Sequence, residues 1–141
     1  MLKYRKNAAP VPVPTPITQP FWDATKEHRL LLQKCNNGHV FYYPRTHCPE
    51  CLSNRLEWLE ASGRGRLYSY TVARRAQGPE FAEDVPYIIA AITLGEGPRM
   101  TSLLVDADPE NVQIEGPVEV AWDDSTDEIS MPWFRPVRTG I

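Results

Sequence analysis

The sequence predicts a mostly β protein in two parts, a small cysteine-containing module and a closed barrel that follows it. Two observations lead to this prediction. All three cysteines of the 141-residue chain fall within residues 33–51, between short apolar segments. Beyond residue 54, β-prone segments alternate with Gly, Pro and Asp turns. The length suits one compact domain with a real core and a small module attached to it.

The composition is that of a globular protein. Apolar residues make up 42% and charged residues 23%, too hydrophobic for a disordered chain. The N-terminal segment lacks the apolar stretch of a secretory signal, and no stretch has the length of a membrane span. We therefore expect a cytoplasmic protein. A net charge of −3 offers no global attraction to nucleic acid.

A proline-rich arm is predicted over residues 1–17. Residues 7–20 contain five prolines and few large side chains, a composition that favours extended polyproline conformation. Such a segment either packs as an arm or stays loose as a disordered tail, and the sequence supports both interpretations about equally.

Residues 18–60 are predicted to form a helix and a ribbon. Thr18 is placed to cap the helix, and a proline falls in its first turn. Phe21 and Trp22 follow as anchors, with burial in the protein's own core favoured over contact with a partner. The β-prone segments RLLLQK and HVFYYP then bracket the first cysteine, which predicts the two arms of a hairpin.

Residues 61–141 are predicted to form the barrel and a C-terminal tail. The strand-like segments include GRLYSYTVARRA, VPYIIAAITLG, RMTSLLVDA, PVEVAWDDS and ISMPWFRPV. Five or six strands in about eighty residues is the scale of a small OB-fold barrel.

The cysteines predict a metal site at the ribbon. Cys48 and Cys51 have the C-x2-C spacing that lets one tight turn aim two sulfurs at a single ion, and Cys35 is a third ligand. The fourth is His39 or His47. We favour His39, because Gly38 allows a tight turn after Cys35, whereas His47 is adjacent to Cys48 and would point away from it.

Four ligands fill a tetrahedral zinc ion, so the metal is expected to be structural rather than catalytic. Other interpretations are buried core thiols, a C-x2-C redox pair and a rubredoxin-like iron site. The cysteine spacing, with its flanking glycine and proline, argues against core thiols. The lack of a βαβ pattern argues against a redox pair, and the lack of a fourth sulfur argues against a rubredoxin-like iron site. Zn²⁺ is the favoured ion.

With these segments in this order, the chain resembles the DUF35 family, small OB-fold proteins with an N-terminal rubredoxin-like zinc ribbon that are associated with acyl-CoA enzymes. The resemblance covers roughly residues 17–137. The first knuckle departs from the family's usual C-x2-C-G, since Gly38 stands where the second cysteine is expected. The segments that carry the resemblance are FWDATKEHRLLLQKC, YYPRTHCPEC, LEWLEASGRGRLYSYTV, VPYIIAAITLGEGPRM and MPWFRP.

The resemblance implies a non-catalytic accessory subunit of a thiolase-like enzyme, such as a β-ketoacyl-CoA thiolase, an acyltransferase or an aldolase. It implies a thiolase-fold partner and a CoA thioester bound jointly with that partner. The residues agree, because no cysteine remains for a nucleophile once zinc is bound. No Ser, His and Asp arrangement can be assembled from the sequence.

Two arginine pairs are candidate contacts for CoA phosphates, Arg64 with Arg66 and Arg74 with Arg75. The interpretation favoured for them is solvated strand-edge charges or partner salt bridges. The aromatic residues Phe41, Tyr42, Tyr43, Trp133 and Phe134 belong either to the core or to a partner-facing surface.

A rival function is a single-stranded nucleic-acid module, because zinc ribbons and OB barrels both bind single strands. The acidic balance and the carboxylates of DDSTDE weaken it. A free-standing redox protein is a third interpretation.

Overall fold

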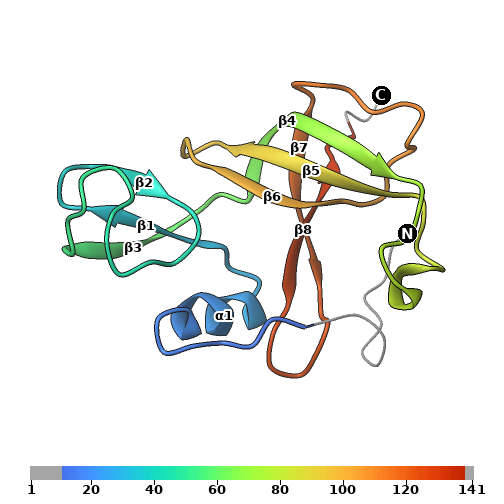
Figure 1. Cartoon of the computed structure of the whole chain (residues 1–141). Coiled ribbons are helices and arrows are strands. Elements are labelled where there is room, and N and C mark those ends of the chain that lie inside the picture. The colour runs from blue at the N-terminus through green and yellow to red at the C-terminus, as the bar shows by residue number, and fades with distance from the viewer. Residues whose placement is uncertain (1–10, 139–141) are drawn as a thin grey trace.

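The ribbon is the N-terminal of two β-structures in the computed structural model, which describes residues 11–138. One helix precedes a three-stranded antiparallel sheet in the order β2-β1-β3 (Figure 1). The edge strand β3 pairs with β1 along its whole length, so it belongs to the ribbon and not to the barrel. These elements are α1 Gln19–Lys26, β1 Leu31–Cys35, β2 Val40–Phe41 and β3 Leu56–Glu60.

The barrel follows at once and is closed, with the strand order β4-β5-β6-β8-β7. Its neighbouring strands are antiparallel except for β6 and β8, which are parallel. A closed five-stranded barrel after the ribbon confirms the predicted OB-type, mostly β fold. Its elements are β4 Arg64–Ala73, the short 3-10 helix η1 Pro79–Phe81, β5 Tyr87–Leu94, β6 Arg99–Leu104, β7 Pro117–Asp123 and β8 Met131–Pro136.

The barrel encloses an apolar core because its strands alternate between inward and outward side chains. Strand β5 is the clearest case, with every second residue from Ile88 to Leu94 buried. Phe134 of β8 is fully buried and belongs to this core. Gly65 lies where β4 pairs with both β5 and β7, and a Cβ there would stand 2.5 Å from the Thr93 carbonyl oxygen. A side chain at this position would therefore force the strands apart.

Helix α1 connects the ribbon to the barrel through an aromatic cluster. Phe21 and Trp22 are buried, which confirms their predicted role as core anchors. The Phe21 ring packs at an angle against the rings of Tyr42 and Tyr43, 5.9 Å and 5.2 Å away between centroids. The indole N–H of Trp22 donates to the Tyr43 hydroxyl at 2.9 Å. The ribbon, the helix and the barrel therefore share one continuous core.

The other aromatic residues named as core or partner-facing also lie inside. Phe41, Trp133 and Phe134 are all buried. The predicted N-terminal arm is described only from residue 11, and residues 1–10 fall outside the described chain. Val11 packs against the core. Residues 11–14 line a groove together with residues 126–129 of the β7–β8 loop.

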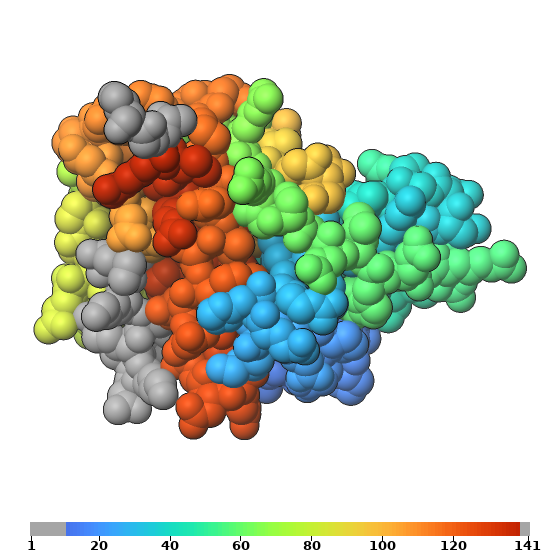
Figure 2. All heavy atoms as spheres, turned by 180° about the vertical axis from the view of Figure 1, so that it is seen from behind, coloured from blue at the N-terminus to red at the C-terminus, as the bar shows by residue number. Residues whose placement is uncertain are grey.

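The ribbon projects sideways from the barrel, as the cyan and green segment in Figure 2 shows. In the same view, blue residues near the end of α1 lie against the orange β7–β8 loop. Within residues 11–138, no helix has both the length and the apolar character needed to cross a bilayer.

Candidate metal centre

Two turns of the ribbon bring four soft donor atoms together. Cys35 ends β1 and His39 precedes β2, while Cys48 and Cys51 come from the loop between β2 and β3. The ligand atoms of these four residues all lie within 4.8 Å of one another. The structure therefore assembles the four residues that the sequence predicted. Cys35 and Cys48 are buried, whereas His39 and Cys51 are partly exposed.

The spacing of the donor atoms matches tetrahedral zinc. Bonds of about 2.3 Å to sulfur and about 2.0 Å to nitrogen place tetrahedral sulfurs about 3.8 Å apart, and sulfur about 3.5 Å from nitrogen. The Sγ atoms of Cys35 and Cys51 are 3.7 Å apart. His39 Nδ1 lies 3.4 Å from the Cys35 sulfur and 3.6 Å from the Cys48 sulfur. The donor set thus fits one Zn²⁺ ion in both chemistry and size.

Backbone turns fix the two knuckles in similar ways. In the first, the Gly38 N–H donates to the Cys35 carbonyl at 3.0 Å, and Gly38 has φ +86°. In the second, the Leu52 N–H donates to the Cys48 carbonyl at 2.9 Å, and Leu52 has φ 62°. Each turn thus has a residue in the left-handed region, which glycine adopts freely and leucine only with strain.

Hydrogen bonds to the sulfurs favour the thiolate form that zinc requires. The Asn37 side-chain amide donates to Cys51 Sγ at 3.3 Å. This bond, and then the backbone N–H of Ser53, lower the pKa of Cys51 to about 6. Burial acts to raise the pKa of Cys35, but N–H groups of His39 and Asn37 outweigh it and lower that pKa. Burial raises the pKa of Cys48.

The two histidines near the cluster differ in their surroundings. His39 turns Nδ1 toward the sulfurs, and its Nε2 lies 3.2 Å from a carboxylate oxygen of Glu50. A carboxylate on the outer nitrogen is the usual partner of a metal-binding histidine, because it orients the ring. His47 is exposed, and its Nδ1 lies 2.9 Å from the Thr46 hydroxyl. It stands outside the cluster.

The four candidate arginines do not form one site. Arg64 and Arg66 line one open groove on the barrel, whereas Arg74 is paired with Glu110 at 2.7 Å. Arg75 does not line that groove. Arg99 and Tyr68, which were not predicted from the sequence, line the groove with Arg64 and Arg66. Arg99 reaches the groove only because β5 pairs with β4 on one side and with β6 on the other, so no local motif indicates it.

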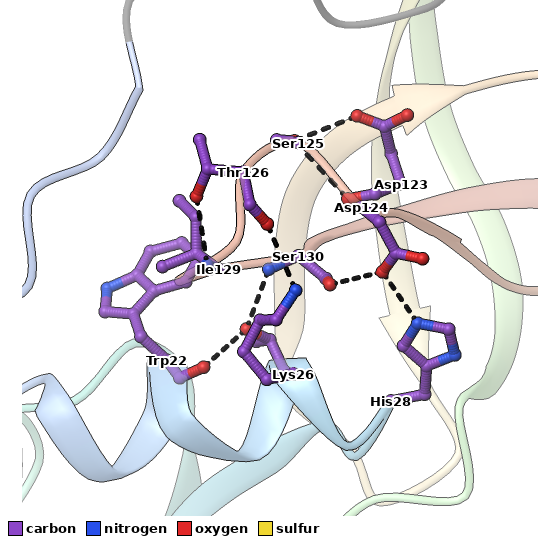
Figure 3. A network of polar contacts seen from close by, with 10 residues as sticks. Trp22, Lys26, His28, Asp123, Asp124, Ser125, Thr126, Ile129 and Ser130 are labelled. Carbon is purple, nitrogen blue, oxygen red and sulfur yellow. Dashed lines mark hydrogen bonds and ion pairs between the residues drawn. The ribbon is translucent and has the colours of Figure 1, made fainter. Parts of the chain in front are cut away.

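A cluster of Ser, His and Asp that was not predicted from the sequence lies at the end of α1 (Figure 3). His28 Nε2 lies 2.8 Å from Asp124 Oδ1, and the Ser130 hydroxyl donates to the same oxygen. In a nucleophilic triad the histidine stands between serine and aspartate. Here the aspartate is central, so the histidine is not placed to act as the base for the serine. Hydrogen bonds from Ser130 and then His28 lower the pKa of Asp124.

This network has a structural role, because it fastens α1 to the β7–β8 loop (Figure 3). The buried Thr25 hydroxyl donates to the Trp22 carbonyl at 2.6 Å and accepts the Ser130 N–H at 3.1 Å. The Lys26 ammonium group donates to the Thr126 carbonyl at 3.0 Å. The end of the helix is thus tied to the barrel at several points.

Fold and site together define a protein with a zinc ribbon followed by an OB barrel, and comparisons with known proteins agree. Residues 22–57 match the family model of the ChsH2 rubredoxin-like zinc ribbon domain. Residues 58–123 match that of the ChsH2 C-terminal OB-fold domain.

Two curated relatives and one solved structure are similar to this chain. A DUF35 domain-containing scaffold protein of Methanothermobacter thermautotrophicus is 39% identical over 69% of this chain and 74% of the relative. A probable enoyl-CoA hydratase alpha subunit of Thermomonospora curvata is 36% identical over 82% of this chain, which spans only 36% of that relative. A chain of the solved Ltp2-ChsH2(DUF35) aldolase has a TM-score of 0.78 at 33% identity, covering 89% of this chain and 98% of that one. The chain belongs to the DUF35 family.

Proposed function

We propose that this chain is a non-catalytic, zinc-stabilised accessory subunit of an acyl-CoA enzyme, with a thiolase-fold protein as its partner. The observation that carries the proposal is the structural match to a chain of the Ltp2-ChsH2(DUF35) aldolase, which covers 98% of that chain. The hydratase alpha subunit is a second relative whose name refers to one subunit of a CoA-dependent enzyme. The archaeal relative is named a scaffold protein, which favours a structural rather than a catalytic role.

In this proposal, Cys35, His39, Cys48 and Cys51 bind a structural Zn²⁺ ion. When bound, the ion supplies folding free energy to the ribbon and no open coordination position for a substrate. The residues hold the two knuckles against each other, and Glu50 orients the His39 ring. Three thiolates and one neutral imidazole leave the site with a net charge of −1, which makes it a weak Lewis acid.

The remaining chemistry of the chain supports a non-catalytic role. All three cysteines belong to the cluster, so none of them is a free nucleophile. Ser130 donates to an aspartate rather than to a histidine. The chain therefore supplies structure and surface, and the acyl transfer or cleavage belongs to the partner subunit. Cysteines that form no disulfide suit the reducing cytoplasm, where we place the complex.

The ribbon is the part best suited to hold a partner. It projects from the barrel (Figure 2) and exposes two large apolar side chains, Leu52 and Trp58, by 73% and 39%. Exposed leucine and tryptophan on a rigid element are typical anchors of protein interfaces. The barrel then stands beside the partner's acyl-CoA pocket and contributes to it.

Co-expression with the thiolase-like protein of the same genome tests this function. We expect a complex that survives size-exclusion chromatography, and turnover that rises at least about tenfold over the partner alone. The variant Trp58→Ala should weaken the complex, whereas Tyr87→Phe, far from the ribbon, serves as a control. A partner that is fully active by itself, and that elutes separately, would contradict the proposal.

Metal analysis of the purified chain tests the ligand set separately. We expect one zinc ion per chain, retained by His47→Ala and lost from His39→Ala on mild chelation. The opposite pattern would assign the ion to His47.

A further inference from the structure

An open groove on the outer face of the barrel gathers three arginines. It has a volume of about 580 Å³. Arg66 on β4 stands opposite Thr93 on β5, which in turn stands opposite Arg99 on β6, so these residues form one row across three strands. Arg64, two residues before Arg66 on the same face of β4, adds a third guanidinium group.

Tyr68 adds an aromatic ring to the groove, at a β-bulge of β4. The register of β4 against β5 shifts between Leu67 and Ser69, so Tyr68 is an extra residue without a partner on β5. Leu67 points into the core, while Tyr68 is 45% exposed on the outer face. Tyr68 follows Arg66 by two residues and lies on the same outer face of β4, so its ring stands beside the arginine row.

Arg99 is held in place before any ligand arrives. Its guanidinium carbon lies 3.5 Å from the centroid of the Tyr68 ring, a cation–π contact. Its Nε–H donates to the Thr93 hydroxyl at 3.3 Å. These two contacts leave its terminal nitrogens available at the groove.

The charges of the groove are not balanced within the described chain. Arg29, Arg74 and Arg135 each form an ion pair with a glutamate. Arg64, Arg66 and Arg99 form none with the carboxylates of residues 11–138. The lining of the groove contains one carboxylate, Glu115, against three guanidinium groups. Three like charges repel one another, so an anion relieves a cost that the fold otherwise carries.

We propose that the groove of Arg64, Arg66, Arg99 and Tyr68 binds the phosphate groups of a small phosphorylated ligand. Guanidinium forks match phosphate oxygens geometrically, and two or three of them suit a diphosphate. Within the proposed function, on which this step rests, the ligand is the phosphate-bearing end of the acyl-CoA that the partner enzyme uses.

The groove suits a small ligand better than a single nucleic-acid strand. Strand binding uses several aromatic platforms, because successive bases each need a ring to stack on. Tyr68 is the aromatic side chain of this groove, and Arg99 covers one of its faces.

Calorimetric titration of the full, zinc-containing chain with pyrophosphate, CoA and dephospho-CoA tests the inference. We expect binding of pyrophosphate and tighter binding of CoA. The substitutions Arg66→Gln and Arg99→Gln should each weaken both at least about tenfold, the effect of one lost charge-assisted hydrogen bond. Arg74→Gln is the matched control, because its guanidinium is already paired with Glu110, and we expect less than a twofold change. All three arginines are exposed, so thermal unfolding should confirm that the variants fold.

Tyr68 gives a second readout. Tyr68→Phe keeps the ring under Arg99 and should keep the affinity, whereas Tyr68→Ala frees Arg99 and should lower it several-fold.

Three results would overturn the inference: no pyrophosphate binding, equal losses for Arg66→Gln and Arg74→Gln, or tighter binding of a single-stranded oligonucleotide than of CoA. The proposed function fails in a different experiment. A stable, active complex whose KM for acyl-CoA is unchanged by Arg66→Gln would refute the groove and retain the accessory role. Pyrophosphate binding without any complex would retain the groove as a phosphate site and refute that role.

Discussion

The ribbon and the barrel are both small β-structures, but they solve the same stability problem in different ways. The barrel closes its sheet on itself and fills the interior with side chains such as Phe134, Ile92 and Leu94, each at most 1% exposed. The ribbon sheet stays open and has only Cys35, Phe41 and Cys48 in its own buried cluster. Two of these three are sulfur donors, so the ribbon's core and its metal site are largely the same atoms.

This difference teaches where each region obtains its stability. Closure of the barrel removes exposed strand edges and buries apolar area, so the barrel is stable without a ligand. An open three-stranded sheet with a tiny core depends on its metal and on the aromatic cluster that it shares with α1. The two regions should therefore respond to different perturbations.

Removal of zinc should produce the largest effect, and only in the ribbon. A structural zinc site contributes on the order of 10 kcal/mol or more. On chelation we expect amide exchange in residues 33–56 to become fast, while the strands β4 to β8 keep their protection. Exchange measured by mass spectrometry checks this. Equal loss of protection in both regions would mean that the barrel also depends on the metal.

Phe134→Ala should produce the opposite pattern. It opens a cavity in the barrel core and should cost about 3–5 kcal/mol of unfolding free energy. Denaturant unfolding measures the cost, and zinc content should stay at one ion per chain in the folded protein. A loss below about 1 kcal/mol would show that the barrel is held together by something other than this core.

Thr25→Val probes the connection between the two regions. Valine fills the same space but leaves the Ser130 N–H, and hence a buried donor, without its acceptor, at about 1–3 kcal/mol. Thr71→Val on the exposed face of β4 is the matched control and should change stability by less than about 0.5 kcal/mol. Chemical denaturation measures the unfolding free energy of both variants. Equal losses would show that the Thr25 hydroxyl does not stabilise the fold through Ser130.

Leu52→Gly should have the smallest effect and the opposite sign. Leu52 has φ 62° and is 73% exposed, so glycine relieves backbone strain of about 1 kcal/mol without losing much buried area. Resistance of the bound zinc to a chelator should rise slightly. A clear fall in zinc retention would show that the leucine side chain stabilises the knuckle.

Much of the fold could be predicted because its signals are local. Cys48 and Cys51 lie three residues apart, and the alternation along β5 is visible in a single segment. The proline near Thr18 marks the start of the helix, although the Thr18 side chain makes no capping hydrogen bond. Three cysteines, one nearby histidine and Gly38 likewise lie close enough in the sequence to indicate one cluster.

The remainder depends on contacts between residues far apart in the sequence. His28 and Asp124 are 96 positions apart, and no pattern near either one indicates the other. The bulge at Tyr68 and the row from Arg66 to Arg99 follow from strand register, which the sequence does not fix beyond the inward and outward pattern. Arg74 is separated from Arg66 because Arg66 lies near the start of β4 and Arg74 directly follows its end.

The hydrogen bond between Trp22 and Tyr43 has a mechanical consequence. It lies in a cluster of packed rings between α1 and the ribbon. Because this cluster belongs to the core that the ribbon shares with the barrel, we expect the ribbon and the barrel not to swing freely against each other. A protein that grips the tip of the ribbon therefore also sets the direction in which the groove faces. The subunit would thus act as a rigid spacer that fixes the orientation of one surface relative to the other.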